Sequence, residues 1–115
     1  MQRAVVTGGA GFIGSNMVDR LIAEGVEVIV IDNLSTGKYE NINPKATFYE
    51  MSLIDLDENI FIGRDIDVVF HFAALARVQP SIEDPLTFNK HNVDGTLRLL
   101  FACHKAGVKR VVYSG

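Results

Sequence analysis

The sequence predicts an α/β fold built on a doubly wound parallel sheet. Short runs rich in β-branched residues alternate with longer segments of helical periodicity. The second run, residues 27–31, is almost continuously apolar, as expected of a parallel strand covered on both faces. A glycine-rich segment directly follows the first run. Because crossovers are right-handed and a ligand crevice is expected beside the first strand, the predicted strand order is 3-2-1-4-5.

The same patterns set the expected bounds of each element. Strands are predicted at residues 4–6, 27–31, 47–51, 67–72 and 109–113. A helix is predicted over residues 12–24, ended by Gly25, with one apolar face made of Ile13, Met17, Leu21 and Ile22. Residues 33–45 are polar and rich in turn formers, and residues 53–62 are expected to form a short helix.

A second long helix is predicted before the fifth strand. Asp84 supplies an N-cap and Pro85 suits the first helical position. The helix is expected to run to about Ala106, with Gly107 as its stop. The apolar residues at helical spacing are Val93, Leu97, Leu100 and Phe101.

Length and composition point to one domain over residues 1–115, with 48% apolar and 22% charged residues and a net charge of −3. The basic residues are scattered, which argues against nucleic-acid binding. The apolar run at the N-terminus is too short for a signal peptide or a membrane span, so a cytoplasmic location is expected. Cys103 is the only cysteine and is expected to be a buried side chain, and no Cys/His spacing predicts a metal site.

The glycine-rich segment predicts a phosphate-binding turn of the Rossmann type. It reads as Gly8-x-x-Gly11-x-x-Gly14, or as Gly9-x-Gly11-x-x-Gly14. One glycine permits the tight turn, Gly11 lets the backbone approach a pyrophosphate, and Gly14 allows close packing of helix and strand. The free N–H groups at the helix start then hold the anion. The position between a strand and an amphipathic helix favours dinucleotide binding over a purely structural turn.

Asp32 follows the second strand, eighteen residues after Gly14. That spacing suits a carboxylate that accepts the ribose 2′-hydroxyl, and such a carboxylate would repel the 2′-phosphate of NADP. NAD is therefore the predicted cofactor. Lys38 weakens this preference slightly, because a nearby cation can accept a phosphate. The alternative for Asp32 is a cap of the turn that follows it.

Three further positions, His71, Gly95 and Asn92, are polar or small residues in otherwise apolar or helical segments. His71 lies inside an apolar strand, where a hydrogen-bonded core histidine is favoured over a catalytic one. Gly95 interrupts the long helix, which costs about 1 kcal/mol relative to alanine, and predicts tight packing there. Asn92, one turn earlier, has two roles open: a hydrogen bond to a backbone segment or a contact with the cofactor.

Together these motifs resemble the extended short-chain dehydrogenase/reductase family, specifically its NAD-dependent nucleotide-sugar epimerases and dehydratases. The similarity runs through residues 6–15, 31–37, 71–74, 92–97 and 111–114. The Asp-Asn-Leu-Ser-Thr-Gly segment at residues 32–37 is particularly like that of the UDP-glucose and UDP-N-acetylglucosamine 4-epimerases of this family.

The resemblance implies a set of cofactor-binding residues. Backbone N–H groups of Phe12 and Ile13 would meet the pyrophosphate, and Asp32 would take the ribose hydroxyls. The chain departs from the family at two positions: Ser52 stands where the family commonly has an adenine-reading aspartate, and Ala76 stands where some epimerases have lysine. The remaining implied residues are Asn33, Leu34, Ser35, Thr36, Gly37 and Lys38 around the adenosine, Leu53 beside Ser52, and Phe72, Ala73, Ala74, Leu75, Ala76 and Asn92 on the nicotinamide side.

The resemblance also implies catalytic residues that this sequence does not contain. The family's Ser/Thr would follow Gly115, and none of Tyr39, Tyr49 and Tyr113 has a lysine four residues later. The chain is therefore interpreted as the N-terminal, cofactor-binding part of a nucleotide-sugar 4-epimerase, inactive by itself. A 4,6-dehydratase and a non-catalytic NAD-binding module are the alternatives. A homodimer of the parent, formed through the long helix, is a further expectation.

Overall fold

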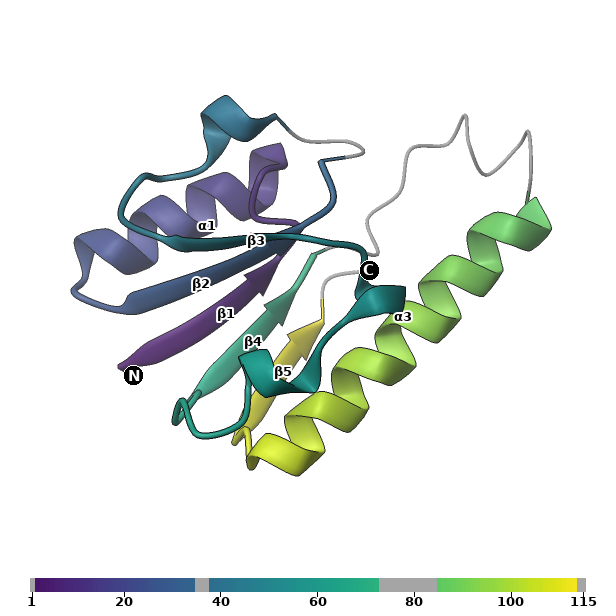
Figure 1. The fold of residues 1–115 in the computed structure, drawn as a ribbon. Coiled ribbons are helices and arrows are strands. Elements are labelled where there is room, and N and C mark those ends of the chain that lie inside the picture. Colours follow the sequence, from purple (N-terminus) through teal and green to yellow (C-terminus); the bar gives the residue numbers. More distant parts are fainter. Residues whose placement is uncertain (1, 35–37, 73–84, 114–115) are drawn as a thin grey trace.

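The computed structural model describes residues 2–34, 38–72 and 85–113, with side chains except at 54, 85–94 and 113. Its centre is one sheet of five parallel strands in the order β3-β2-β1-β4-β5 (Figure 1). This confirms the predicted fold class and strand order. The strands are β1 (Arg3–Thr7), β2 (Glu27–Asp32), β3 (Thr47–Glu50), β4 (Val68–His71) and β5 (Arg110–Tyr113).

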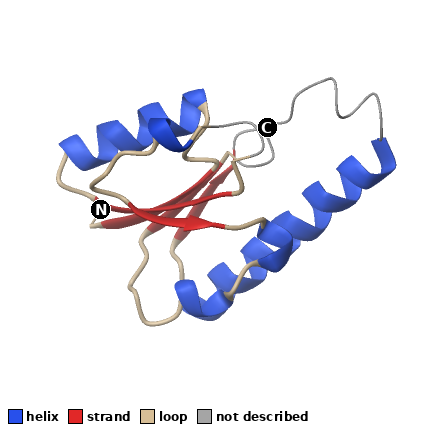
Figure 2. Ribbon diagram, turned by 45° about the horizontal axis from the view of Figure 1, so that its top comes forward, coloured by secondary structure: helices blue, strands red, loops and turns tan. Residues whose placement is uncertain are grey.

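Among the described residues, one long helix covers each face of the sheet (Figure 2). Helix α1 (Phe12–Ala23) joins β1 to β2, and helix α3 (Pro85–Ala106) precedes β5. The alternation of side chains along each strand separates two apolar clusters. Val5, Ile29 and Val69 face the α3 side, whereas Val6 and Val30 face the α1 side. The interior positions of β1, β2 and β4 are apolar, as expected where both faces of a strand are buried.

Residues 53–62 do not form the single helix that the sequence predicts. They form two 3-10 helices, η2 (Leu53–Asp55) and η3 (Glu58–Ile60). Leu56 between them has non-helical backbone angles, with φ −58° and ψ 126°, and the Asp57 carboxylate accepts a hydrogen bond from the Asn59 N–H at 2.9 Å. Aspartate competes for backbone donors in this way and favours a new turn over helix propagation.

The buried face of each helix also differs from the predicted one. In α1 the buried residues are Gly14, Val18 and Leu21, with Met17 and Ile22 partly buried in the same cluster. Ile13, predicted on that face, is exposed. Gly14 takes its place because a residue without a side chain fits where the helix begins against the turn.

In α3 the predicted apolar face is wrong. Leu97, Leu100 and Phe101 are exposed, and Leu99, Ala102 and Cys103 pack against the sheet instead. Both sets have helical spacing, so periodicity alone could not choose between them. Gly95 is buried and lies one turn before Leu99 on the same helix.

No helix in the described part of the chain is long and apolar enough to cross a membrane.

Replacing Leu99 and Leu97 tests which face of α3 is buried. Leu99 is 0% exposed and Leu97 is 60% exposed. Leu99→Ala is expected to lower the free energy of unfolding by about 2–5 kcal/mol, because it leaves a cavity in the core. The matched control Leu97→Ala is expected to change it by less than about 0.5 kcal/mol. Urea unfolding of both variants measures this, and equal losses would contradict the assigned face.

Candidate functional site

The predicted phosphate turn joins β1 to α1 at the carboxyl edge of the sheet. Gly8 has a φ of +75°, a left-handed conformation that favours glycine. Its N–H donates to the Ile31 carbonyl at 2.9 Å, and the Gly11 N–H donates back to the Gly8 carbonyl at 3.1 Å. The chain therefore leaves the sheet and reverses within three residues.

Close approach, rather than backbone angle, requires glycine at two further positions. A Cβ on Gly14 would overlap the Gly8 carbonyl oxygen and lie 3.0 Å from the Gly9 Cα. A Cβ on Gly9 would lie 2.5 Å from a methyl carbon of Val30. A Cβ on Gly11 would meet its nearest atom at 3.5 Å, an ordinary contact. Gly14 thus packs the helix against the turn itself, a refinement of the predicted helix–strand contact.

The first turn of α1 presents backbone donors at this edge. Gly11 is the N-cap and provides no side-chain cap, and the Ser15 N–H donates to the Gly11 carbonyl at 2.8 Å. The N–H groups of Phe12, Ile13 and Gly14 precede that bond and have no acceptor within the helix. Phe12 is 83% exposed. Free donors together with the positive end of the helix dipole form a site suited to an anion.

Asp32 ends β2 beside this turn and holds two backbone groups. It is 7% exposed. One carboxylate oxygen accepts from the Ala10 N–H at 2.9 Å and the other from the Leu34 N–H at 2.7 Å. The alternative function predicted for Asp32, capping the following turn, is therefore present. A carboxylate can accept about four hydrogen bonds, so capacity for ligand hydroxyls remains.

The loop after Asp32 begins and returns beside the glycine turn. Asn33 is exposed, and Leu34 adopts a left-handed φ of +63°, which its bond to Asp32 stabilises. Lys38 is exposed, and its N–H donates to the Ala10 carbonyl at 3.2 Å. The predicted residues Ser35, Thr36 and Gly37 lie outside the described residues.

The other predicted residues follow β3 and β4. Ser52 precedes η2, and the neighbouring Met51 N–H donates to the Asp32 carbonyl at 3.1 Å. The side chain of Leu53 packs against the core on the α3 side, and that of Phe72 is buried on the α1 side. Ala73, Ala74, Leu75 and Ala76 lie outside the described residues, as does the side chain of Asn92.

His71 is a hydrogen-bonded core residue, as the sequence predicts. It is 1% exposed. Its Nδ1 lies 2.7 Å from the Thr7 hydroxyl oxygen and its Nε2 lies 3.1 Å from the Thr96 hydroxyl oxygen. The Phe72 N–H also donates to the Thr7 hydroxyl at 3.0 Å. Burial lowers the pKa of His71, which favours the neutral ring. The imidazole thus links β1, β4 and α3.

Four further residues at this edge are not indicated by any sequence pattern described above: Thr7, Thr96, Ala10 and Asn41. The Asn41 side-chain amide donates to the Ala10 carbonyl at 3.1 Å. The two threonines complete the contacts of His71. A polar residue at the end of an apolar run is a sequence signal that could have indicated Thr7. No local pattern pairs Asn41 with Ala10.

Cys103 and the acidic residues offer no second reactive centre among the residues described. Cys103 is buried, as predicted, and burial raises the pKa of its thiol to about 11. No group of three or more His, Cys, Asp or Glu side chains in the described ranges could hold a metal ion.

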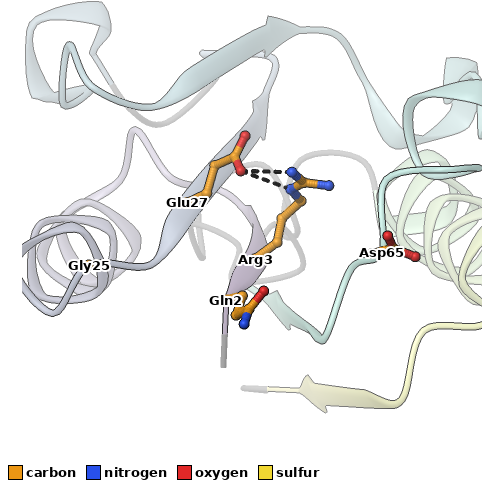
Figure 3. Close-up of a pocket in the computed structure, with 5 residues that line it drawn as sticks. All are labelled: Gln2, Arg3, Gly25, Glu27 and Asp65. Atoms are coloured by element: carbon orange, nitrogen blue, oxygen red, sulfur yellow. Dashed lines mark hydrogen bonds and ion pairs between the residues drawn. The ribbon is translucent and has the colours of Figure 1, made fainter.

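A shallow pocket lies at the opposite, amino edge of the sheet (Figure 3). Its lining residues are Gln2, Arg3, Gly25, Glu27 and Asp65. The Arg3 guanidinium donates to one Glu27 oxygen from two nitrogens, at 2.8 and 3.1 Å, and also contacts the Arg64 carbonyl. Arg3 and Glu27 are thus paired with each other, and ligands of open α/β sheets bind at the carboxyl edge. The carboxyl edge is therefore the candidate site.

Comparison with known proteins identifies relatives of the chain. The profile of a family described as the NAD dependent epimerase/dehydratase family matches residues 4–115. A UDP-glucose 4-epimerase of Streptococcus mutans is 43% identical over 114 residues, which are 96% of this chain and 34% of that protein.

Two solved structures show the same fold over nearly the whole chain. The UDP-glucose 4-epimerase of Thermotoga maritima with UDP-glucose has a TM-score of 0.94 and 48% identity, over 99% of this chain and 38% of that one. The UDP-glucose 4-epimerase of Thermus thermophilus in complex with NAD has a TM-score of 0.86 and 45% identity, over 96% of this chain and 36% of that one. The chain thus spans about a third of the length of these relatives.

Alanine substitutions at two glycines distinguish a position that requires glycine for packing from one that has room for a side chain. Gly14→Ala is expected to lower the free energy of unfolding by about 1–3 kcal/mol, because its Cβ overlaps the Gly8 carbonyl. Gly11→Ala has room for its Cβ and is expected to leave the melting temperature within a few degrees of the unsubstituted chain. Thermal unfolding followed by circular dichroism checks both, and a stable Gly14→Ala variant would refute the close approach.

The buried His71 ring predicts a dependence of stability on pH. Its pKa is lowered in the folded chain, so the unfolded chain takes up a proton first as pH falls below about 6.5. The contribution of the neutral His71 ring to the free energy of unfolding should therefore be fully present above that pH. It should decline as pH falls toward the folded pKa, by at most about 1.4 kcal/mol per pH unit.

Urea unfolding between pH 5 and 8 measures this slope. His71→Asn should reduce the slope in that window. The exposed His104 on α3 provides the control, and His104→Gln should leave the slope unchanged. An unchanged slope in His71→Asn would contradict the neutral, buried ring.

Proposed function

The chain belongs to the NAD dependent epimerase/dehydratase family, and on that premise we propose that it binds NAD at the carboxyl edge of the sheet. The observation that carries this proposal is the pairing of free N–H groups at the start of α1 with the Asp32 carboxylate beside them. The N–H donors suit the pyrophosphate of a dinucleotide, and the carboxylate acceptor suits the hydroxyls of its adenosine ribose.

The residues present fit this cofactor. The glycine turn leaves open space on the outer side of Gly11, since only the Gly8 carbonyl lies near its missing Cβ. Backbone N–H groups of Phe12 and Ile13 would hold the pyrophosphate. Asp32 would accept the ribose hydroxyls with the lone pairs that Ala10 and Leu34 leave free. A 2′-phosphate would meet the Asp32 carboxylate, so NAD would be preferred over NADP.

The remaining positions in the proposed site rest on the resemblance of the sequence. Asn33 to Lys38 would line the adenosine end, and Ser52 and Leu53 would lie beside the adenine. Because the side chain of Phe72 is buried in the core, its contact with the cofactor would be made by backbone. Residues 73–76 and Asn92 would complete the nicotinamide end.

We further propose that the protein of which this chain forms the NAD-binding part is a nucleotide-sugar 4-epimerase of the UDP-hexose type. Bound NAD would supply a reversible hydride acceptor for the sugar C4 position. The chain's own contribution is to bind and orient the cofactor. The similarity to named UDP-glucose 4-epimerases supports this activity over that of a dehydratase. Since the sequence has no Tyr-x-x-x-Lys pair, the chain alone is expected to bind NAD without epimerising a sugar.

Isothermal titration with NAD+ and NADP+ tests the cofactor proposal. Tighter binding of NAD+, by about tenfold or more, is expected from the repulsion between Asp32 and a 2′-phosphate. Asp32→Asn should narrow this ratio and weaken NAD+ binding, because it removes both the charge and one backbone contact. Glu24→Gln removes an equal charge at the far end of α1 and should leave the ratio unchanged. Equal affinity for both cofactors in the unsubstituted chain would reject the assignment of Asp32.

A further inference from the structure

Ala10, at the middle of the glycine turn, is held from both sides. It is fully buried. Its N–H donates to the Asp32 carboxylate at 2.9 Å. Its carbonyl accepts from the Lys38 N–H at 3.2 Å and from the Asn41 side-chain amide at 3.1 Å. These bonds fix the peptide planes on both sides of Ala10, one of which carries the Gly11 N–H that closes the turn.

The group that donates from Asn41 is itself well anchored. Asn41 ends the 3-10 helix η1 (Tyr39–Asn41), and its N–H donates to the Lys38 carbonyl at 2.9 Å. The Tyr39 ring packs edge-on against Phe48 of β3, with centroids 5.9 Å apart. The amide of Asn41 is therefore presented to the turn from a segment attached to the sheet, 31 residues away in sequence.

The orientation of the Ala10–Gly11 peptide determines where α1 begins. Gly11 is the N-cap, and Phe12 and Ile13 follow it directly. If this peptide rotated, the N–H groups of the first helical turn would no longer converge on one point. Hydrogen-bond donors lose most of their strength when they are misaligned, and binding weakens when the ligand must order the site itself.

We propose that Asn41 is a positioning residue for the pyrophosphate of the cofactor. It holds the Ala10 carbonyl so that the helix donors converge, and it joins the loop beside the adenosine to the phosphate turn without touching the ligand. This inference rests on the proposed binding of NAD. It assigns a role to a residue that lies outside both the glycine pattern and the acid at the end of β2.

The test compares two variants at Asn41 with matched variants at Asn43. Asn43 lies two residues further along, and its side chain bonds elsewhere: its amide donates to the Asp19 carboxylate of α1 at 3.0 Å, and its oxygen accepts from the Lys45 N–H at 2.9 Å. Asn41→Ala removes the donor. Asn41→Asp keeps the shape of the side chain but sets an oxygen against the Ala10 carbonyl. Asn43→Ala removes a side-chain amide from the same loop, and Asn43→Asp adds a charge to it.

Affinities for NAD+, ADP-ribose and adenosine are measured by titration calorimetry and ligand-observed NMR. Asn41→Ala should weaken NAD+ and ADP-ribose binding by about fivefold, the equivalent of one neutral hydrogen bond. Asn41→Asp should weaken both further. Adenosine has no pyrophosphate and should bind all variants alike. The Asn43 variants should bind the three ligands as the unsubstituted chain does.

The outcomes distinguish the two proposals. If the unsubstituted chain binds neither NAD+ nor ADP-ribose, the proposed function fails, and this inference fails with it. If it binds them and the Asn41 variants bind equally well, only the positioning role is overturned. The positioning role is also overturned if adenosine binding falls in parallel or if the Asn43 variants show the same loss, since either result indicates general loosening of the loop.

Discussion

The contact between the first turn of α1 and the carbonyl of Gly8 is the constraint on which the site depends. A Cβ at Gly14 would overlap that oxygen, so the helix can begin here only because this residue has no side chain. Its start is consequently fixed against the end of β1, the central strand of the sheet. The free donors of the helix therefore have a defined position relative to β2 and Asp32. A site built on rigid elements is held more precisely than one built on loops.

The same edge of the sheet collects the polar groups that a hydrophobic core would otherwise exclude. Thr7, Asp32 and His71 are the buried polar residues of the described chain, and each ends its strand. Each also has a hydrogen-bonded partner in a neighbouring element. Buried polar groups without partners destabilise a fold by about 1–3 kcal/mol each. The paired arrangement lets the chain place polar chemistry at one edge while the strand interiors remain apolar.

Those elements of the fold that depend on local sequence could be predicted from it. Apolar strands such as residues 27–31 and the glycine spacing indicated the parallel sheet and the phosphate turn. The buried face of α3 could not be predicted, because Leu97 and Leu99 each belong to a set with helical spacing. Only the position of the sheet decides between those two sets. The helix predicted for residues 53–62 was wrong for a different reason: the side chain of Asp57 accepts a hydrogen bond from a backbone N–H that a continuous helix would use.

The contacts that shape the site were the least predictable because they join residues far apart in the chain. Asn41 reaches Ala10 across 31 positions, and His71 reaches Thr7 across 64. Asp32 was predictable as an acid at the end of β2, but not as the residue that ties the glycine turn to the following loop. Because two of its lone pairs hold Ala10 and Leu34, this carboxylate is fixed in position by the protein itself. A ligand hydroxyl that binds there would not have to order the acid, so binding loses less conformational entropy.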